Sequence, residues 1–331
     1  MAQRSRRSEI SVNQTPGGVV GLGLMGSSIA TCLLAAGHPL AGVARTPKEG
    51  RAAMKRIAGF LAEHKKEGLL NESVGRTLAR LTISTDYKIL ADCEFVVESI
   101  IEDLKAKRAV IAAIEKSVSP KTLIGSNTSA LPITKLQRGM KHPKRVVGIH
   151  WGEPAHINKF MEVICGDETD KRFAARAMAL AEGWGKEPAL VRRDIRGFIT
   201  NRIMYAMLRE AFFLVESGLA TPEDVDRSVR NDYGYWMTFA GPFRFMDVTG
   251  IPAYAAVMRE LWPELSCAKK VPKLMRKIVK SGALGLRNQR GFFRYTPVEA
   301  LEWEKKFVEF SYDIRKVATK YNYLNRRGQE L

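Results

Sequence analysis

Three glycines at fixed spacing, Gly21, Gly23 and Gly26, lie within a mostly apolar stretch at 17–36. An apolar run of strand length at 17–20 precedes them, and a stretch rich in Ala, Leu and Ile at 27–36 follows. A tight turn, a close backbone approach to a pyrophosphate and close helix–strand packing each require glycine at one of these positions. The pattern therefore predicts a strand, a turn and a helix whose N-terminus binds the anionic part of a dinucleotide.

Strand-like and helical patterns alternate along the first part of the chain. The strand-like runs are 17–20, 40–44, 81–85, 95–98, 122–126 and 146–150, and the helical patterns are 27–36, 51–67, 72–80 and 104–117. This alternation predicts an α/β fold with a Rossmann-type, doubly wound, mostly parallel sheet. Only helical patterns of comparable strength follow, at 199–217, from 221, and at 253–261, 271–281 and 298–321. We therefore predict a frayed tail at 1–16, a dinucleotide-binding domain at 17–194 and an all-α domain at 195–331.

The charge balance is unusual for a chain of ordinary composition. The 331 residues include 53 Lys and Arg against 35 Asp and Glu, a formal net charge of +18, while 45% are hydrophobic. This composition excludes a disordered chain, a collagen-like repeat and a small disulfide scaffold. The positive field attracts polyanions, so nucleic acid, an anionic membrane and a phosphate-rich cofactor are all candidate partners.

Cysteine spacing argues against a metal site. Cys32, Cys93, Cys165 and Cys267 are too far apart in the sequence for CxxC or another metal-binding pattern. We therefore expect reduced cysteines in a cytoplasmic protein that holds no metal. No apolar run reaches the roughly 18 residues of a membrane span, and the polar N-terminus does not have the pattern of a secretory signal.

The end of the second strand-like run bears on the choice of cofactor. An acidic residue that binds the adenosine ribose is expected there, but the sequence has Ala44-Arg45-Thr46. An Arg45 guanidinium can stack on adenine and pair with a 2′-phosphate, which favours NADP. The alternative is a solvated basic strand end in a protein that uses NAD. The sequence therefore predicts NAD or NADP, with a slight preference for NADP.

Several further motifs occur in an order that resembles the 3-hydroxyacyl-CoA dehydrogenase family over about residues 17–296. They are the three glycines, Val96-Val-Glu98 with Glu102 and Lys107, Ser126-Asn-Thr-Ser129, His150, Glu162, Gly197-Phe-Ile-Thr-Asn201-Arg202, Gly241-Pro-Phe243 and Gly291-Phe-Phe-Arg-Tyr295. The resemblance implies an oxidoreductase of the kind that acts in fatty acid metabolism. Such an enzyme transfers a hydride between a nicotinamide cofactor and a secondary alcohol β to a carboxyl or thioester carbonyl.

His150 and Glu162 are the predicted catalytic dyad. His150 ends a strand at the carboxyl edge of the predicted sheet, and Glu162 follows twelve residues later on an expected antiparallel return strand. A carboxylate bound to one imidazole nitrogen fixes the tautomer, so that the other nitrogen can accept a proton from a hydroxyl.

The resemblance assigns roles to further residues. Ser129 and Asn201 would bind the reacting oxygen and complete the catalytic set. The expected cofactor-binding residues are Gly21, Gly23, Met25, Gly26, Arg45, Glu102, Lys107 and Asn127.

One residue departs from the family pattern in a way that bears on the substrate. Glu153 stands where the family carries an Asn, and an ionised carboxylate cannot donate a hydrogen bond. The substrate is therefore either an acyl-CoA or a free β-hydroxy acid, such as a sugar acid, a carnitine-like compound or a hydroxylated aromatic acid. By resemblance, Lys55 and other cations of the 51–67 helix would contact CoA phosphates, whereas the alternative for them is a solvated helix face.

Partners follow from the same reasoning. The resemblance implies a homodimer formed through the helical domain, and the amphipathic pattern at 298–321 packs on the body or on a second subunit. A non-catalytic, polyanion-binding protein on the same fold is the alternative of another class. We expect no membrane contact and no nucleic-acid binding, because the basic stretch at 269–280 lacks interleaved aromatic residues.

Overall fold

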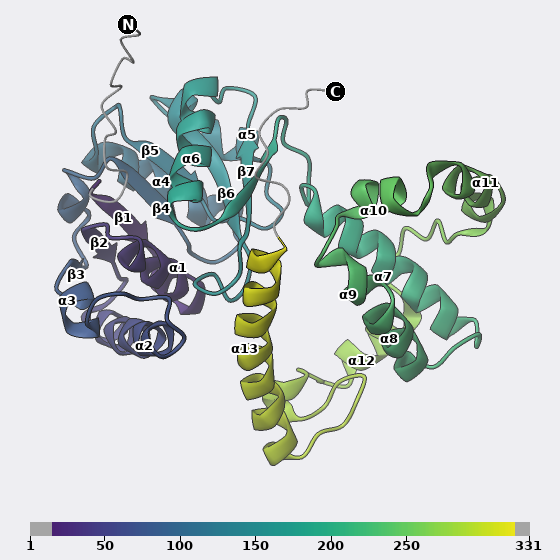
Figure 1. The fold of residues 1–331 in the computed structure, drawn as a ribbon. Helices are drawn as coiled ribbons and strands as arrows, with labels where there is room; N and C mark the ends of the chain where they lie inside the picture. Colours follow the sequence, from purple (N-terminus) through teal and green to yellow (C-terminus); the bar gives the residue numbers. More distant parts are fainter. Residues whose placement is uncertain (1–14, 322–331) are drawn as a thin grey trace, which may run out of the picture. The chain divides into compact units, whose positions relative to one another are not determined.

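The computed structural model describes residues 15–321, so all but the end of the predicted tail at 1–16 lies outside the described residues. The chain forms two compact units, the first extending to Asn201 and the second beginning at Arg202 (Figure 1). Among the described residues, no helix combines the length and the apolar character needed to cross a membrane.

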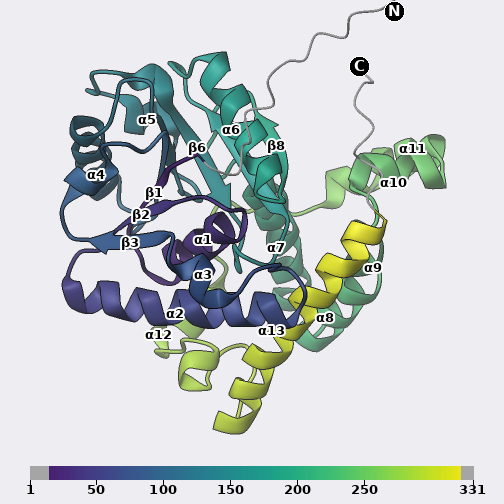
Figure 2. The same cartoon turned by 60° about the vertical axis from the view of Figure 1, so that its left-hand side comes forward.

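An eight-stranded sheet forms the centre of the first unit (Figures 1 and 2). Its strands are β1 (Gly17–Val20), β2 (Leu40–Val43), β3 (Leu81–Ser84), β4 (Phe95–Glu98), β5 (Leu123–Ser126), β6 (Val146–Trp151), β7 (Phe160–Cys165) and β8 (Glu187–Val191). The order is β3-β2-β1-β4-β5-β6-β7-β8, and every neighbouring pair is parallel except β6 and β7. The predicted Rossmann-type sheet is therefore confirmed.

Helices cover both faces of this sheet. They are α1 (Leu24–Ala35), α2 (Pro47–Lys66), α3 (Val74–Leu78), α4 (Leu104–Ser117), α5 (Ile133–Gln137) and α6 (Lys171–Gly183). Apolar residues of α1, α2 and α6 pack into one buried cluster, and those of α4 and α5 pack into another. Adjacent β1 residues Val19 and Val20 belong to different clusters because successive strand side chains point to opposite faces.

Local capping explains where some elements differ from the sequence expectation. The helix predicted at 51–67 begins at Pro47, because the Thr46 hydroxyl accepts a hydrogen bond from the backbone N–H of Glu49.

Helix α6 and strand β8 had no predicted counterpart. β8 is a partly exposed edge strand, so it lacks the apolar run that identifies a buried one.

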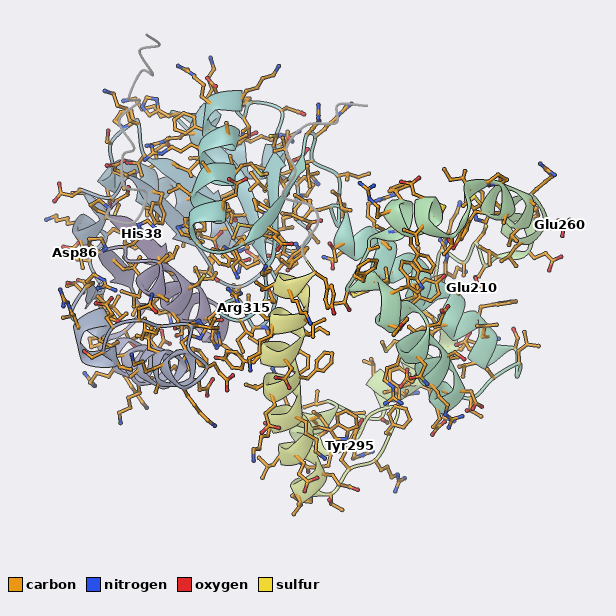
Figure 3. The ribbon with its side chains drawn as sticks, in the orientation of Figure 1. His38, Asp86, Glu210, Glu260, Tyr295 and Arg315 are labelled. Atoms are coloured by element: carbon orange, nitrogen blue, oxygen red, sulfur yellow. The ribbon has the colours of Figure 1, made fainter. Side chains whose placement is uncertain are left out.

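His38 illustrates a histidine used for structure rather than chemistry (Figure 3). It is fully buried, and its Nε2 accepts a hydrogen bond from Trp184 Nε1 at 3.0 Å. Nδ1 therefore carries the proton, which it donates to the Thr15 carbonyl at 2.8 Å. Burial lowers the pKa of His38 more than the Thr15 contact raises it, so the ring stays neutral.

The second unit is helical, which confirms the predicted all-α region. It contains most of α7 (Thr200–Glu216), followed by α8 (Pro222–Asn231), α9 (Tyr233–Met237), α10 (Pro242–Thr249), α11 (Ile251–Leu261), α12 (Lys273–Lys280) and α13 (Pro297–Lys320). Long-range polar contacts support the connections, such as Glu210 of α7 accepting from the Ser266 N–H at 2.8 Å (Figure 3). A capping box of Thr296 and Glu299 starts α13.

The glycine turn provides a matched pair of substitutions. A Cβ on Gly26 would overlap the Gly21 carbonyl oxygen, whereas a Cβ on Gly23 would have no neighbour within 4 Å. We expect Gly26→Ala to lower the free energy of unfolding by at least about 1–3 kcal/mol. Gly23→Ala should leave it within about 0.5 kcal/mol of the wild-type value. Urea unfolding of the two variants measures this difference, and equal stabilities would contradict the packing of the turn.

Candidate active site

His150 and Glu162 face each other across the antiparallel pair β6–β7. The strand register places the two residues directly opposite, and His150 Nδ1 lies 2.8 Å from Glu162 Oε2. Both residues are buried, with exposed fractions of 7% and 1%. The return strand that the sequence predicted is thus present, and it brings the predicted dyad together.

The second oxygen of Glu162 is held by the start of α7. Oε1 accepts hydrogen bonds from the backbone N–H groups of Ile199 at 3.0 Å and Thr200 at 2.9 Å. The chain reaches this position through Gly197 and Phe198, which both have positive φ values. Phe198 is buried, and its ring lies 5.8 Å from the His150 ring. The helix N-terminus and the dyad therefore form one rigid arrangement.

These contacts decide the charge of Glu162. Burial alone would raise the pKa of this carboxyl. The hydrogen bonds from His150, Thr200 and Ile199, together with the field of His150, outweigh burial and lower the pKa below its ordinary value of 4.5. Glu162 is therefore ionised at neutral pH, so His150 Nδ1 is the donor in their hydrogen bond. Nε2 is left as the nitrogen that can accept a proton.

The glycine turn lies at the N-terminus of α1, as the sequence predicted. Gly21 has a φ of 90°, and a Cβ there would collide with the Ser99 backbone. Gly23 is the N-cap residue of α1 and faces open space. Unpaired N–H groups at the start of α1 therefore remain accessible to an anion. Met25 packs against the core beside this turn. The residues present fit the pyrophosphate of a nicotinamide dinucleotide.

A buried ion pair lies below the ends of β4 and β5. Glu98 and Lys107 have exposed fractions of 0%, and their Oε1 and Nζ atoms are 2.8 Å apart. Glu98 also accepts from the Ser126 hydroxyl at 2.5 Å and from the Ile100 N–H at 2.7 Å. Lys107 donates to the Asn127 carbonyl at 3.0 Å. Lys107 thus supports the 127–130 loop from below, in a position fully shielded from solvent.

Glu102 organises the same loop from the outside. Its Oε1 accepts from the Thr128 hydroxyl at 2.6 Å and from the N–H groups of Ser129 and Ala130 at 2.9 and 3.1 Å. Asn201 Nδ2 donates to the Ser129 carbonyl at 2.7 Å. The structure therefore brings Glu102, Ser129 and Asn201 into one network.

Asn127 connects this loop to the strand that carries His150. Its Nδ2 donates to the Ser99 hydroxyl at 3.1 Å, and its Oδ1 accepts from the Trp151 N–H at 3.2 Å. The predicted cofactor side and the predicted base are therefore joined through one amide side chain.

Three predicted residues lie apart from this network. Arg45 is 85% exposed and donates through Nε and Nη2 to the Glu49 carboxylate. Lys55 and Glu153 are exposed on α2 and on the β6–β7 loop. Within residues 15–321, no group of three or more His, Cys, Asp or Glu is placed to hold a metal ion.

Sequence reasoning did not identify the function of Glu98 or the two N–H groups that hold Glu162. A charged residue at the end of an apolar strand was the available signal for Glu98, since a buried carboxylate requires partners. The N–H groups of Ile199 and Thr200 carry no sequence signal, because every residue except proline has one.

The lowered pKa of Glu162 has a consequence for stability. A group whose pKa is lower in the folded state stabilises the fold above its unfolded pKa and loses this contribution as the pH falls. We expect wild-type stability to decline as the pH drops below about 4.5, the ordinary value of a Glu carboxyl. Glu162→Gln removes this titration and should show a smaller decline. Urea midpoints of both proteins at pH 7, 5 and 4 test this, and parallel declines would contradict it.

Comparison with known proteins gives the family. The sequence model for the 3-hydroxyacyl-CoA dehydrogenase NAD-binding domain matches residues 17–195, and that for the 3-hydroxyacyl-CoA dehydrogenase C-terminal domain matches residues 197–295. A probable 3-hydroxybutyryl-CoA dehydrogenase of Bacillus subtilis is 34% identical over 84% of this chain and 96% of that protein. A 5-formyl-3-hydroxy-2-methylpyridine 4-carboxylate 5-dehydrogenase of Mesorhizobium japonicum is 32% identical over 87% of this chain and 93% of that protein.

Solved structures agree. A 5-formyl-3-hydroxy-2-methylpyridine 4-carboxylic acid 5-dehydrogenase, described as an NAD+ dependent dismutase, is similar with a TM-score of 0.87 and 29% identity, covering 92% of this chain and 99% of that one. The (S)-3-hydroxybutyryl-CoA dehydrogenase of Ralstonia eutropha gives a TM-score of 0.72 and 30% identity, covering 86% of this chain and 99% of that one. The chain therefore belongs to the 3-hydroxyacyl-CoA dehydrogenase family.

Proposed function

We propose that this protein is a nicotinamide-dependent dehydrogenase that oxidises a secondary alcohol β to a carboxyl or thioester carbonyl. The observation that carries the proposal is the His150–Glu162 pair, in which the ionised Glu162 holds Nδ1 and leaves Nε2 as the nitrogen that can accept a proton. The glycine turn follows β1, and the pair lies on β6 and β7, with β4 and β5 between them in the sheet. Asn127, just after β5, connects the two regions through its contacts with Ser99 and the Trp151 N–H. Ligands of this fold bind at the carboxyl ends of the parallel strands.

In the proposed reaction, protein side chains accept the proton and the bound cofactor accepts the hydride. His150 Nε2 takes the hydroxyl proton while the carbonyl forms, and the ionised Glu162 stabilises the imidazolium that results. Two backbone N–H groups keep Glu162 fixed during this change. Ser129 and Asn201 hydrogen-bond the reacting oxygen. The nicotinamide ring, when bound, accepts the hydride that leaves the alcohol carbon.

The first unit binds a nicotinamide dinucleotide, and we infer that this is NAD. The Arg45 guanidinium, which an adenosine 2′-phosphate would need, is already engaged by Glu49. A phosphate at this place would have to compete with that carboxylate and would be repelled by it. The slight sequence preference for NADP rested on Arg45 alone, without this pairing.

For the substrate, we infer the 3-hydroxyacyl type with a free acid as the second candidate. The match to both 3-hydroxyacyl-CoA dehydrogenase domain models supports the first candidate, and two observations support the second. The TM-score of 0.87 to the pyridine carboxylic acid dehydrogenase exceeds the 0.72 to the hydroxybutyryl-CoA dehydrogenase. In addition, Arg56 of α2 donates to the Leu22 carbonyl at 2.7 Å and the Ser27 hydroxyl at 3.2 Å. That cation is therefore turned toward the glycine turn, while Lys55 remains exposed.

The state of the cysteines indicates the cellular compartment in which the protein acts. All four are free thiols in the structure. Because free thiols persist in a reducing environment, we place the reaction in the cytoplasm as part of this proposal.

An assay of hydride transfer tests the function. Formation of NADH from NAD, or of NADPH from NADP, is measured with 3-hydroxybutyryl-CoA and with free β-hydroxy acids, including sugar acids and carnitine, and with a hydroxylated pyridine acid. We expect His150→Ala to lower kcat by at least about 10³-fold while NADH binding stays unchanged, because only the proton acceptor is lost. His142→Ala, on the partly exposed turn before β6, is the matched control. Turnover unchanged in His150→Ala would refute the assignment.

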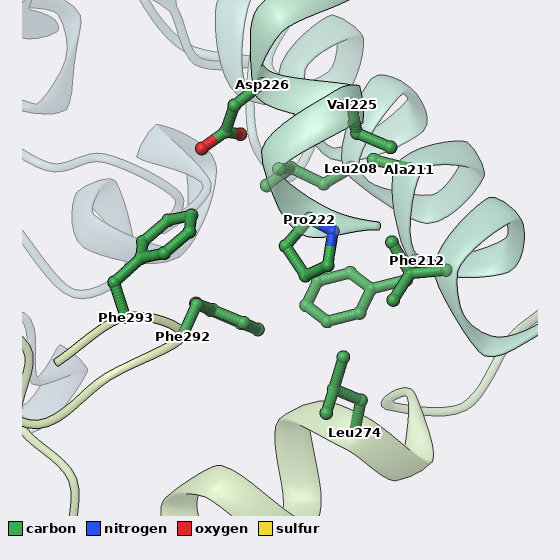
Figure 4. Close-up of a pocket in the computed structure, with 10 residues that line it drawn as sticks. Leu208, Ala211, Phe212, Pro222, Val225, Asp226, Leu274, Phe292 and Phe293 are labelled. Atoms are coloured by element: carbon green, nitrogen blue, oxygen red, sulfur yellow. The ribbon is translucent and has the colours of Figure 1, made fainter. Parts of the chain in front are cut away.

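Exposed apolar surface in the second unit supports a homodimer. Helices α7 to α12 contain no buried residue, and Tyr235 and Phe243 are 83% and 78% exposed. An apolar pocket of about 140 Å³ opens between α7, α8, α12 and the segment 291–295, with Phe292 and Phe293 on one side and Phe212 on the other (Figure 4). Apolar surface on this scale is typical of an obligate interface, so we propose that a second copy covers it.

Molar mass in solution tests the dimer. We expect light scattering to give twice the 37.0 kDa of one chain at micromolar concentration. Tyr235→Glu combined with Phe243→Glu should shift the mass to that of a monomer, because two carboxylates would be buried without partners. Leu69→Glu, at a 38% exposed leucine of the first unit, should leave the dimer intact. A monomeric wild-type protein would refute this proposal.

A further inference from the structure

His156, on the loop between β6 and β7, is held by a hydroxyl from the helix that begins at the glycine turn. Ser28 Oγ lies 2.6 Å from His156 Nδ1 and 3.0 Å from the His156 backbone nitrogen. Both residues are buried, with exposed fractions of 3% and 5%. Ser28 is two residues beyond Gly26 on α1, and His156 is six residues beyond His150. One hydroxyl thus joins the cofactor-binding turn to the loop that follows the base.

The direction of these hydrogen bonds follows from counting protons. The backbone N–H of His156 can only donate, so Ser28 Oγ accepts from it. The single hydroxyl proton of Ser28 is then free to point at Nδ1, which must accept and be unprotonated. Burial, followed by the nearby charges of His64 and Lys186, lowers the pKa of His156 to about 3. The ring is therefore neutral at neutral pH, where the hydrogen bond from Ser28 is kept.

Other contacts keep this loop in one position. The Phe60 ring of α2 stacks on the His156 ring with centroids 4.3 Å apart, and the His64 ring lies 5.3 Å away. The Lys186 ammonium donates to the carbonyls of Ala155 and Asn158. Because α1 and α2 both contact His156, a shift of α1 must be transmitted to the loop or break the Ser28 bond.

We propose that Ser28 and His156 are positioning residues that couple occupation of the glycine turn to the order of the 152–159 loop. A dinucleotide on the N-terminus of α1 restrains the first turn of that helix, and the Ser28 hydroxyl passes the restraint to the loop. The base and the hydride acceptor are held by different elements, and an error of about 1 Å in their alignment costs about 100-fold in rate. This inference rests on the proposed function for its catalytic consequence, but the coupling itself needs only NAD binding.

Hydrogen exchange of the full-length protein with and without NAD tests the coupling. In the wild type, NAD should slow amide exchange both at 21–28 and at 152–159. In Ser28→Ala and His156→Leu, NAD should slow exchange only at 21–28. His156→Asn keeps an acceptor at the position of Nδ1 and should restore the protection at 152–159.

Thr31→Val is the matched control. Thr31 is a fully buried α1 residue whose hydroxyl bonds only to the Ser27 carbonyl of its own helix, at 2.9 Å, so its loss should leave the coupling intact. For a substrate accepted in the assay above, Ser28→Ala should lower kcat about tenfold with an unchanged KM for NAD, as expected for the loss of one buried hydrogen bond.

Two results would overturn the proposal. One is a wild-type loop whose exchange does not respond to NAD, and the other is full NAD-dependent protection of the loop in Ser28→Ala and His156→Leu. The exchange experiment requires no turnover. A protein that binds NAD and shows the coupling but transfers no hydride would therefore refute the proposed function alone.

Discussion

The Glu162 carboxylate is the interaction on which the rest of the site depends. One oxygen holds the His150 imidazole, and the other receives two N–H groups at the start of α7. A single buried charge therefore fixes the tautomer of the base and the point where the chain leaves the sheet. Its position follows from the antiparallel register of β6 and β7, since a shift of one residue would turn the carboxylate to the opposite face.

The cofactor side uses a second buried carboxylate in the same manner. Glu98 is compensated by Lys107, by the Ser126 hydroxyl and by a backbone N–H, so the desolvation of both charges is offset by several hydrogen bonds. The Lys107 ammonium reaches on to the Asn127 carbonyl, and the Asn127 amide reaches the strand of His150. Glu98 is thus connected to the strand of His150 through Lys107 and Asn127, and each of the two buried carboxylates has its own set of hydrogen-bond donors.

Local patterns in the sequence were sufficient for the fold class, whereas His150 and Glu162 were singled out by the family order of the motifs around them. Apolar runs, glycine spacing and helix caps each lie within a short segment of the sequence. A return strand after twelve residues is also a local arrangement. Features formed by distant residues were not accessible in this way. Ser28 and His156 are 128 positions apart, and neither stands in a pattern that points to the other. Arg45 gave an incomplete indication of cofactor preference, because its Glu49 partner is visible only once α2 is known to begin at Pro47.

The tautomer of His150 is the most direct test of this account. Nitrogen-15 NMR of histidine-labelled protein at neutral pH resolves both ring nitrogens, and the sequence has only five histidines, so His150→Asn identifies the signal by its disappearance. The account predicts a protonated Nδ1, bonded to Glu162, and an unprotonated Nε2 available to a substrate hydroxyl. A proton on Nε2 with Nδ1 bare would contradict it, because Glu162 would then be the protonated partner and His150 would have no free nitrogen to act as the base.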